Sequence, residues 1–203
     1  FSVNISIIDC LVENNQCPGQ FGSIFVGYSP YDGYSQYSQV TIRNTQISGN
    51  TGGYAGAGLY FRVNNEGLIE NCLINNNNAT EPTWGNGAGG GINVSMSNNT
   101  TINNCTIANN TAGSWGGGIH LFNAEGSKIY NTILWGNSAG IYGNQISMEL
   151  YNDASFSIEI DYSLIENGIN GVHTANNQSV TFGNDIIDLD PLFADTANSD
   201  YHL

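Results

Sequence analysis

Three side chains carry a permanent positive charge, and their chemistry can be tested first: Arg43, Arg62 and Lys128. A polysaccharide lyase uses such a group as the base that removes the proton beside a sugar carboxylate, with several carboxylates holding Ca²⁺. A glycoside hydrolase instead needs two converging carboxylates. The chain has 17 Asp and Glu residues and a formal net charge of −14. Whether these groups can act together depends on the elements that position them.

A repeat runs through the chain and sets those positions. Similar segments are anchored on Ile7, Ile42, Ile69, Ile102, Ile129 and Ile160, and a second series follows glycine-rich stretches at Ile24, Leu59, Ile92, Ile119 and Ile146. Together the two series define a unit of about 27 residues, and each longer unit carries its insertion at one place. Such insertions are typical of loops that protrude from a regular coil.

The pattern inside each unit predicts short strands. Apolar residues alternate, as in Val40 and Ile42 or Leu59 and Phe61, and Asn and Gly separate the segments. Three short strands per unit predict an all-β fold, a parallel β-helix (solenoid) of about six to seven coils. We expect coils over residues 1–182, an acidic capping or linker segment over 183–203, and a chain that is a piece of a longer protein.

The composition excludes several other classes of protein. Asn is abundant and Gly numbers 26, and both disfavour a mostly helical fold. Three cations cannot neutralise a phosphate backbone, so we expect no nucleic-acid partner. No apolar run approaches the roughly 20 residues of a membrane span.

Aligning the units places like residues in columns. The two Asn columns are Asn44, Asn71, Asn104 and Asn131, and Asn50, Asn77, Asn110 and Asn137. We expect them to form hydrogen-bonded ladders along the coil axis. Cys72 and Cys105 share a column with Thr45 and Thr132, which favours small buried ladder residues over a disulfide or a metal site. Cys10 and Cys17 could pair only with each other.

The same columns give two of the three cations ordinary partners. Arg43 shares an outward column with Glu70, and Lys128 shares another with Glu159 on the adjacent coil, so we expect surface ion pairs. Arg62, whose column neighbours are Gly27 and Ser95, is the best candidate for a catalytic cation.

The carboxylates favour a solvated face over a catalytic pair. Those of the central coils do not stack on adjacent coils, and Asp153, Glu159 and Asp161 cluster only locally. The dense carboxylates at Asp185, Asp188 and Asp190 could hold calcium, although an acidic cap over the last coil is the simpler interpretation.

Aromatic residues are concentrated in the insertions. Those singled out are Tyr28, Tyr31, Tyr34 and Tyr37, which recur every third residue, together with Trp84, Trp115 and Tyr142. Trp115 and Tyr142 occupy one column on adjacent coils. Exposed rings on a rigid scaffold could stack on sugars or anchor a protein, and they could equally fold back over the coils as a satellite core.

Two motifs resemble a known group. The segments Gly116-Gly117-Gly118-Ile119 and Gly89-Gly90-Gly91-Ile92 are similar to right-handed parallel β-helix repeats of secreted bacterial proteins, including polymorphic outer-membrane protein repeats. The ending from Asp188 to Asp195, followed by Asp200-Tyr201-His202-Leu203, resembles the tail of choice-of-anchor β-helix proteins. The resemblance implies a right-handed coil and an extracellular or cell-surface location.

These observations favour a non-catalytic extracellular module for adhesion, structural spacing, assembly or glycan contact. The partners expected are a polysaccharide, cell-surface proteins, flanking domains or further copies stacked end to end on the open coils. The alternative is a polysaccharide lyase or glycoside hydrolase, and calcium is the one cofactor considered.

Overall fold

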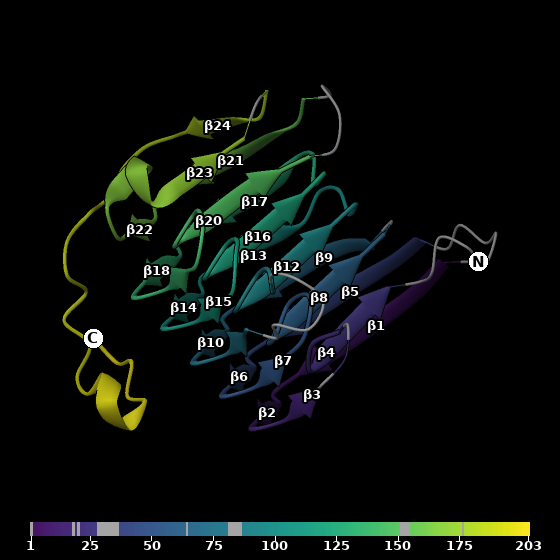
Figure 1. Ribbon diagram of the computed structural model, residues 1–203, viewed down its shortest axis with the longest axis horizontal. Helices are drawn as coiled ribbons and strands as arrows, with labels where there is room; N and C mark the ends of the chain where they lie inside the picture. Colours follow the sequence, from purple (N-terminus) through teal and green to yellow (C-terminus); the bar gives the residue numbers. More distant parts are fainter. Residues whose placement is uncertain are drawn as a thin grey trace.

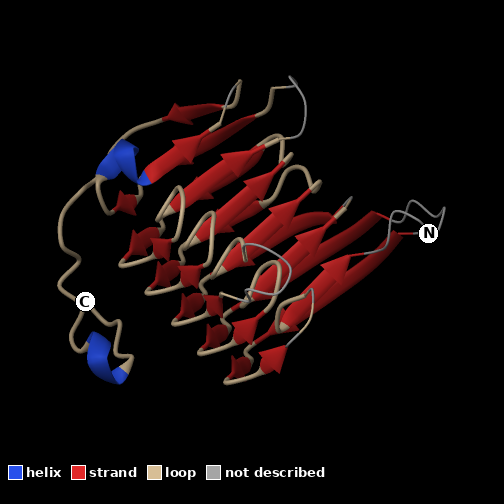
Figure 2. Cartoon of the chain, viewed as in Figure 1, coloured by secondary structure: helices blue, strands red, loops and turns tan. Residues whose placement is uncertain are grey.

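The computed structural model describes residues 2–17, 19, 21–27, 37–63, 65–80, 87–150, 155–175 and 177–203, without the side chains of Ser2, Tyr37 and Asn65. Short strands stack one coil upon the next, from the N-terminal coil to the C-terminal coil (Figure 1). Strands make up most of this stack, and two short 3₁₀ helices, η2 (Gly168–Gly171) and η3 (Thr196–Asn198), lie toward the C-terminus (Figure 2).

The described strands form four parallel sheets, which we name A to D in the order that one coil visits them. Sheet A contains β1 (Ser2–Ile8), β5 (Tyr37–Arg43), β9 (Asn65–Glu70), β13 (Thr101–Asn103), β17 (Ser127–Tyr130), β21 (Ser157–Asp161) and β24 (Ser179–Phe182). Sheet B contains β2 (Leu11–Glu13), β6 (Gln46–Ser48), β10 (Leu73–Asn75), β14 (Thr106–Ala108), β18 (Ile133–Trp135) and β22 (Leu164–Ile165).

Sheets C and D complete the coil. Sheet C contains β3 (Gln16–Cys17), β7 (Thr51–Gly52), β11 (Asn78–Ala79), β15 (Thr111–Ala112) and β19 (Ser138–Ala139). Sheet D contains β4 (Ile24–Gly27), β8 (Leu59–Arg62), β12 (Ile92–Ser95), β16 (Ile119–Phe122), β20 (Ile146–Glu149) and β23 (Val172–Thr174). In both sheets each strand pairs in parallel with the corresponding strand of the next coil.

The predicted parallel β-solenoid is confirmed, but three strands per coil was wrong. Full coils have a fourth strand, contributed by sheet C. Its strands are only two residues long, which is too short for the alternation by which strands are recognised in a sequence. The inward positions match the prediction, because Val40, Ile42, Leu59 and Phe61 are buried. Stacked apolar side chains therefore fill the interior of the coil.

The inner Asn column forms the predicted ladder. Asn50 Nδ2 donates to Asn77 Oδ1 at 2.9 Å, and Asn77 Nδ2 donates to Asn110 Oδ1 at 3.0 Å. Asn110 Nδ2 donates in turn to Asn137 Oδ1 at 3.0 Å. All four side chains are buried, so the ladder satisfies polar groups that would otherwise be desolvated without partners.

The ladder continues beyond the Asn residues that the sequence revealed. Asn137 Nδ2 donates to Gln145 Oε1 at 2.7 Å, and Gln145 Nε2 donates to Glu166 Oε2 at 2.7 Å. Along the row each side-chain amide donates to the next side-chain oxygen toward the C-terminal end, and the Glu166 carboxylate accepts at the end of the row. The four Asn amides also donate to backbone carbonyls of the preceding coil. A negative charge there complements the aligned amide dipoles.

The outer Asn column has a different main role. Asn44, Asn71, Asn104 and Asn131 have φ values of 50°, 53°, 51° and 48°, in the left-handed region that Asn tolerates. Asn71 Nδ2 donates to Asn44 Oδ1 at 3.3 Å, whereas Asn131 Nδ2 donates to Asn103. Turn geometry between sheets A and B, more than a continuous ladder, explains the repeated Asn.

The four cysteines are free thiols. Cys72 and Cys105 are buried in the interior column, and their Sγ atoms lie 3.2 Å from the backbone oxygens of Glu70 and Asn103. Cys10 is exposed and Cys17 is partly exposed, without a bond between them. The interpretation of Cys72 and Cys105 as small ladder residues fits this arrangement.

The C-terminal segment leaves the stack and returns along its side. Ile187 pairs with Leu164 of β22, and the chain then runs back beside earlier coils (Figure 1). Tyr201 is buried there, and its hydroxyl accepts from Asn109 Nδ2 at 2.8 Å and donates to Asn76 Oδ1 at 3.3 Å. The acidic segment thus continues sheet B briefly and then bridges several coils. Among the described residues, no helix is long and apolar enough to cross a membrane.

Candidate functional site

The outer face of sheet D carries buried side chains, which is unusual for an outward face of a solenoid. Tyr60, Asn93, His120 and Ser147 lie in register on β8, β12, β16 and β20, and we call them the outer row. The residues that alternate with them along each strand point into the core. The outward side chains of the outer row are nevertheless buried as well, and that of Ser147 is completely buried. A polar row in such a position requires a covering layer.

Aromatic side chains from the corner before sheet D contribute to that layer. Trp115 and Tyr142 precede β16 and β20, and they pair with each other on adjacent coils as predicted. Each is followed by a glycine with positive φ, Gly116 at 64° and Gly143 at 67°. A Cβ atom on Gly116 would lie 2.3 Å from the carbonyl oxygen of Ile119, so the tight corner that places Trp115 requires glycine.

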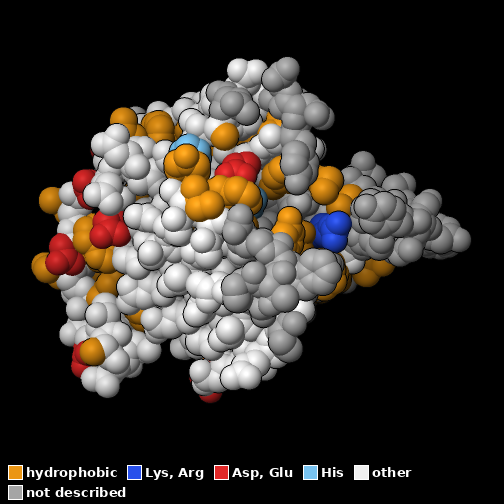
Figure 3. Space-filling view, in the orientation of Figure 1, with side chains coloured by type: hydrophobic (Ala, Val, Ile, Leu, Met, Phe, Trp, Pro, Cys, Tyr) orange, Lys and Arg blue, Asp and Glu red, His pale blue; other side chains and the backbone are white. Residues whose placement is uncertain are grey.

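The rings at this face stack in pairs. The Trp115 ring lies 6.2 Å from the His120 ring at an interplanar angle of 23°, and the Tyr142 ring lies 4.4 Å from the His173 ring at 9°. Tyr142 is 52% exposed and Trp115 is half-buried. We call Trp115, Tyr142 and His173 the aromatic strip. In the space-filling view, apolar side chains gather over the strands of sheet D with acidic and histidine side chains among them (Figure 3).

His120 is held as a neutral donor beneath Trp115. Asn93 Nδ2 donates to the Ala88 carbonyl at 3.2 Å and lies 3.1 Å from His120 Nδ1, which must therefore accept. The ring proton then resides on Nε2. Desolvation by complete burial lowers the pKa of His120 to about 4, so the ring is uncharged at neutral pH. With Nδ1 occupied and Nε2 protonated, His120 cannot act as a general base.

Three polar atoms of the outer row have no hydrogen-bond partner: Asn93 Oδ1, His120 Nε2 and Ser147 Oγ. Glu149 is the nearest charged neighbour, with Oε2 4.0 Å from His120 Nε2. Burial raises the pKa of the Glu149 carboxyl. The arrangement supplies neutral donors and acceptors beneath aromatic rings, with one partly buried carboxylate beside them.

The cations lie where the columns predicted. Arg43 Nε is 2.8 Å from Glu70 Oε2, and Lys128 Nζ is 3.2 Å from Glu159 Oε2, so both ion pairs on sheet A are confirmed. Arg62 is on β8 between Gly27 and Ser95, on the outer face of sheet D.

The described residues hold no group of three or more His, Cys, Asp or Glu that could bind a metal ion. Asp188 accepts from the Asn167 N–H at 2.8 Å, and Asp190 accepts from the Leu192 N–H at 2.9 Å. Asp188 therefore ties the C-terminal segment to the turn before η2, and Asp190 fixes a turn within the segment. A calcium site with Asp185 stays a prediction.

Several predicted binding residues lie outside the described residues: Tyr28, Tyr31, Tyr34 and Trp84. Tyr37 belongs to β5, but its side chain is not described. Of the predicted set, Trp115 and Tyr142 are brought together. The sequence analysis missed Asn93, Ser147 and His173, although one more unit after Ile146 would have placed His173 in the His120 column.

One family model covers most of the chain. The model described as right-handed β-helix region matches residues 2–141 and also residues 32–192. Searches of curated proteins and of solved structures give no match. The matched ranges span nearly all the coils described above, and the chain therefore belongs to the right-handed β-helix family.

Proposed function

We propose that this chain is a rigid extracellular or cell-surface β-helix module that binds an uncharged glycan along the outer face of sheet D. The observation that carries the proposal is the aromatic strip, in which Trp115, Tyr142 and His173 present rings from three successive coils. Trp115 and Tyr142 are in register on adjacent coils, so their backbones are separated by the strand spacing of about 4.8 Å, comparable with the length of one pyranose unit.

The chemistry of the strip suits a sugar. Aromatic faces stack on the apolar faces of pyranose rings, and amphipathic rings tolerate a wet surface. The half-buried Glu149 carboxylate lies next to the strip and can accept hydrogen bonds from hydroxyl groups. His120 supports Trp115 from below, which fixes one ring before the ligand arrives.

The charge distribution favours an uncharged chain over an acidic one. The protein has a formal net charge of −14, and no Lys or Arg follows Lys128 in the sequence. An acidic polysaccharide would be repelled by this field, and Glu149 would add to the repulsion at the strip. A neutral glycan avoids both penalties.

The fold supports an adhesive or spacing role for the same module. The central coils hydrogen-bond their neighbours through all four sheets, and the Asn ladder adds a buried row of side-chain hydrogen bonds. Such a stack holds the rings at fixed separations, which limits the entropy lost on binding.

Affinity retention on immobilised polysaccharides tests the proposal. We expect the protein to be retained on a neutral panel of cellulose, xylan and mannan, and to pass through polygalacturonate and alginate. Trp115→Ala and Tyr142→Ala should each weaken retention about tenfold, which corresponds to about 1.4 kcal/mol of lost stacking.

Tyr162→Ala is the matched control, because Tyr162 is 53% exposed at a different corner of the coil. Equal loss in this control, or preference for the acidic panel, would contradict the proposal. Release of soluble oligosaccharides from any column would point to the lyase or hydrolase alternative.

A further inference from the structure

The stack ends in an incomplete coil. β24 extends sheet A, and Ile187 extends sheet B by pairing with Leu164, but sheet D ends one coil earlier at β23. After Ile187 the chain leaves the stack (Figure 1). The last coil therefore has its first two sides and lacks the strand that would cover β23.

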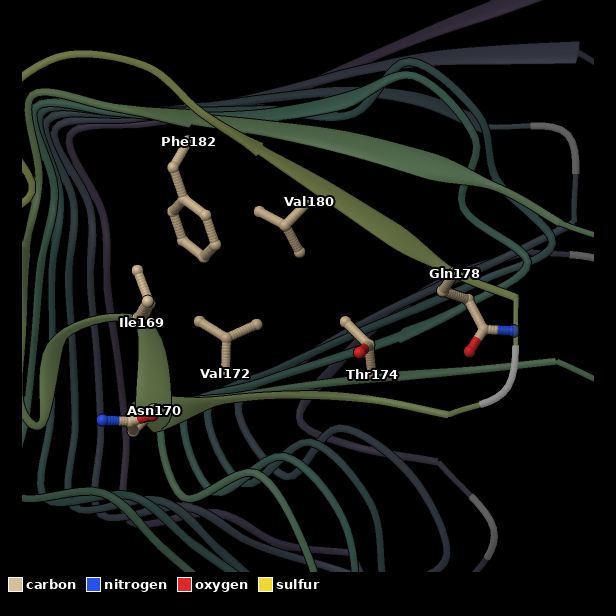
Figure 4. Close-up of a pocket in the computed structure, with 7 residues that line it drawn as sticks. All are labelled: Ile169, Asn170, Val172, Thr174, Gln178, Val180 and Phe182. Atoms are coloured by element: carbon tan, nitrogen blue, oxygen red, sulfur yellow. The ribbon is translucent and has the colours of Figure 1, made fainter.

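A groove lies at this open end of the stack, between β23 and β24. It has a volume of about 240 Å³ and is lined by Ile169, Asn170, Val172, Thr174, Gln178, Val180 and Phe182. The side chains of Val172 and Thr174 face those of Val180 and Phe182 across it (Figure 4). An added strand would place every second side chain in the space between Val172, Val180 and Phe182.

Gln178 gives the groove an unsatisfied polar group. This side chain is 7% exposed, and neither its amide nitrogen nor its amide oxygen has a hydrogen-bond partner. Leaving both atoms buried without partners is unfavourable. A peptide unit offers one N–H donor and one C=O acceptor, which is the complement of the Gln178 amide.

The surroundings of the groove are acidic. Asp188 is exposed beside η2, where its carboxylate accepts from Asn167, and Glu166 is partly exposed at the same end. No Lys or Arg follows Lys128 in the sequence to balance them. A basic residue next to the added strand would therefore be attracted to this end.

A second copy stacked end to end does not fill the groove. The first strand of that copy, β1, would follow β24 in sheet A, so its β4 would lie one coil above the missing strand. The chain's own C-terminal segment is engaged elsewhere, because Tyr201 is bound to Asn76 and Asn109. The empty position would hold one strand, and neither a second copy nor the C-terminal segment supplies that strand.

We infer that this groove binds an extended segment of another polypeptide as an added parallel strand on β23. Apolar side chains at alternate positions enter the space between β23 and β24, and Gln178 pairs with the backbone of the segment. A Lys or Arg on its N-terminal side contacts Asp188 and Glu166. The module would thereby be joined to a second protein at its C-terminal end, independently of the glycan face.

A peptide built on the chain's own sheet D pattern tests the inference. The probe is fluorescent Lys-Lys-Gly-Ile-Asn-Val-Ser-Lys, which carries the sequence of residues 91–95 between lysines. We expect saturable binding by fluorescence anisotropy that weakens with added salt. The control peptide Lys-Lys-Gly-Ile-Val-Asn-Ser-Lys has the same composition, but one apolar side chain must face solvent. It should bind at least about tenfold more weakly.

Gln178→Leu separates a binding role from a structural one. The change removes an unpaired buried amide, so the free protein should melt at a higher temperature, whereas peptide affinity should fall about tenfold. Thr174→Glu places a charge in the groove at an exposed position and should abolish binding. Thr181→Glu on the outward side of β24 is its matched control and should bind like the parent protein.

Three results would overturn the inference. They are equal binding of the two peptides, unchanged affinity in Gln178→Leu, and growth of the protein alone into long rods in sedimentation experiments. The last result would assign the end of the stack to further copies of this chain. Loss of glycan retention in the strip variants leaves this test untouched, because the two sites use different residues.

Discussion

The outer faces of sheets A and D are built on the same ladder of coils but differ in what they present. On sheet A the outward side chains include two ion pairs, Arg43 with Glu70 and Lys128 with Glu159, whose charged groups remain in contact with water. On sheet D the outward Asn93 and Ser147 are buried. Register and strand alternation are common to both faces, so neither explains the difference.

The corners explain part of it. Trp115 and Tyr142 enter sheet D through glycine corners, and their rings stack on His120 and His173 of the outer face. Side chains from the corner thereby turn an outward strand face into a second packed layer. A solenoid face that is covered in this way can hold oriented polar groups, whereas an uncovered face supports only solvated pairs.

The largest expected effect comes from placing one charge on each face. Ser147→Lys introduces an unpaired ammonium group at a completely buried position and should lower the free energy of unfolding by about 3–5 kcal/mol. Thr181→Lys places the same group on exposed β24, next to Glu159, and should change it by less than about 0.5 kcal/mol. Urea unfolding of both variants measures the contrast. Similar values would show that the outer face of sheet D is not a packed layer.

The pH dependence of stability should distinguish the faces next. His120 has a folded pKa of about 4 against 6.5 for the free side chain, so the unfolded state binds the proton first as the pH falls. Stability should be lost between about pH 6.5 and pH 4, by about 3 kcal/mol in total. Burial lowers the pKa of His173 and acts in the same direction, whereas the raised pKa of Glu149 opposes it.

His120→Phe keeps a ring beneath Trp115 and removes this titration. Urea unfolding at pH 7 and at pH 4.5 should show a smaller loss of stability in the variant than in the parent protein. Parallel losses in the two proteins would mean that His120 titrates normally and that its burial is transient.

The smallest expected effect belongs to sheet A. A double-mutant cycle of Arg43→Ala and Glu70→Ala should give a coupling of about 0.2–1 kcal/mol, because both groups are partly solvated. The coupling should weaken in 0.5 M salt, since screening acts on exposed pairs. A coupling above about 2 kcal/mol that does not change with salt concentration would mean that this pair is as shielded from solvent as the buried face of sheet D.

Much of the fold could be predicted because it repeats. The spacing of Ile42, Ile69 and Ile102 fixed which residues stack, and the ion pairs of Arg43 and Lys128 followed from columns alone. The fourth strand was missed because a strand of two residues is too short to show the alternation of apolar and polar side chains. The Glu166 end of the amide ladder was missed because Gln145, eight residues after Asn137, is outside the Asn column, and Glu166 follows it only on the next coil.

The candidate site was less accessible to sequence reasoning. Trp115 and Tyr142 could be placed in one column, but their stacking on His120 and His173 depends on side-chain direction across a glycine corner. Burial of the outer row likewise cannot be derived from alternation, which assigns those positions to solvent.

The sequence by itself determined the solenoid, its register and the pairs that share a column, because a repeated local pattern leaves one way to stack like residues. The tertiary structure alone decided which outward face is covered, where the seventh coil stops, and that the Gln178 amide is buried without a partner at the open end of the stack. These properties depend on how corners and the C-terminal segment pack over the coils. Such packing joins residues that no local period relates.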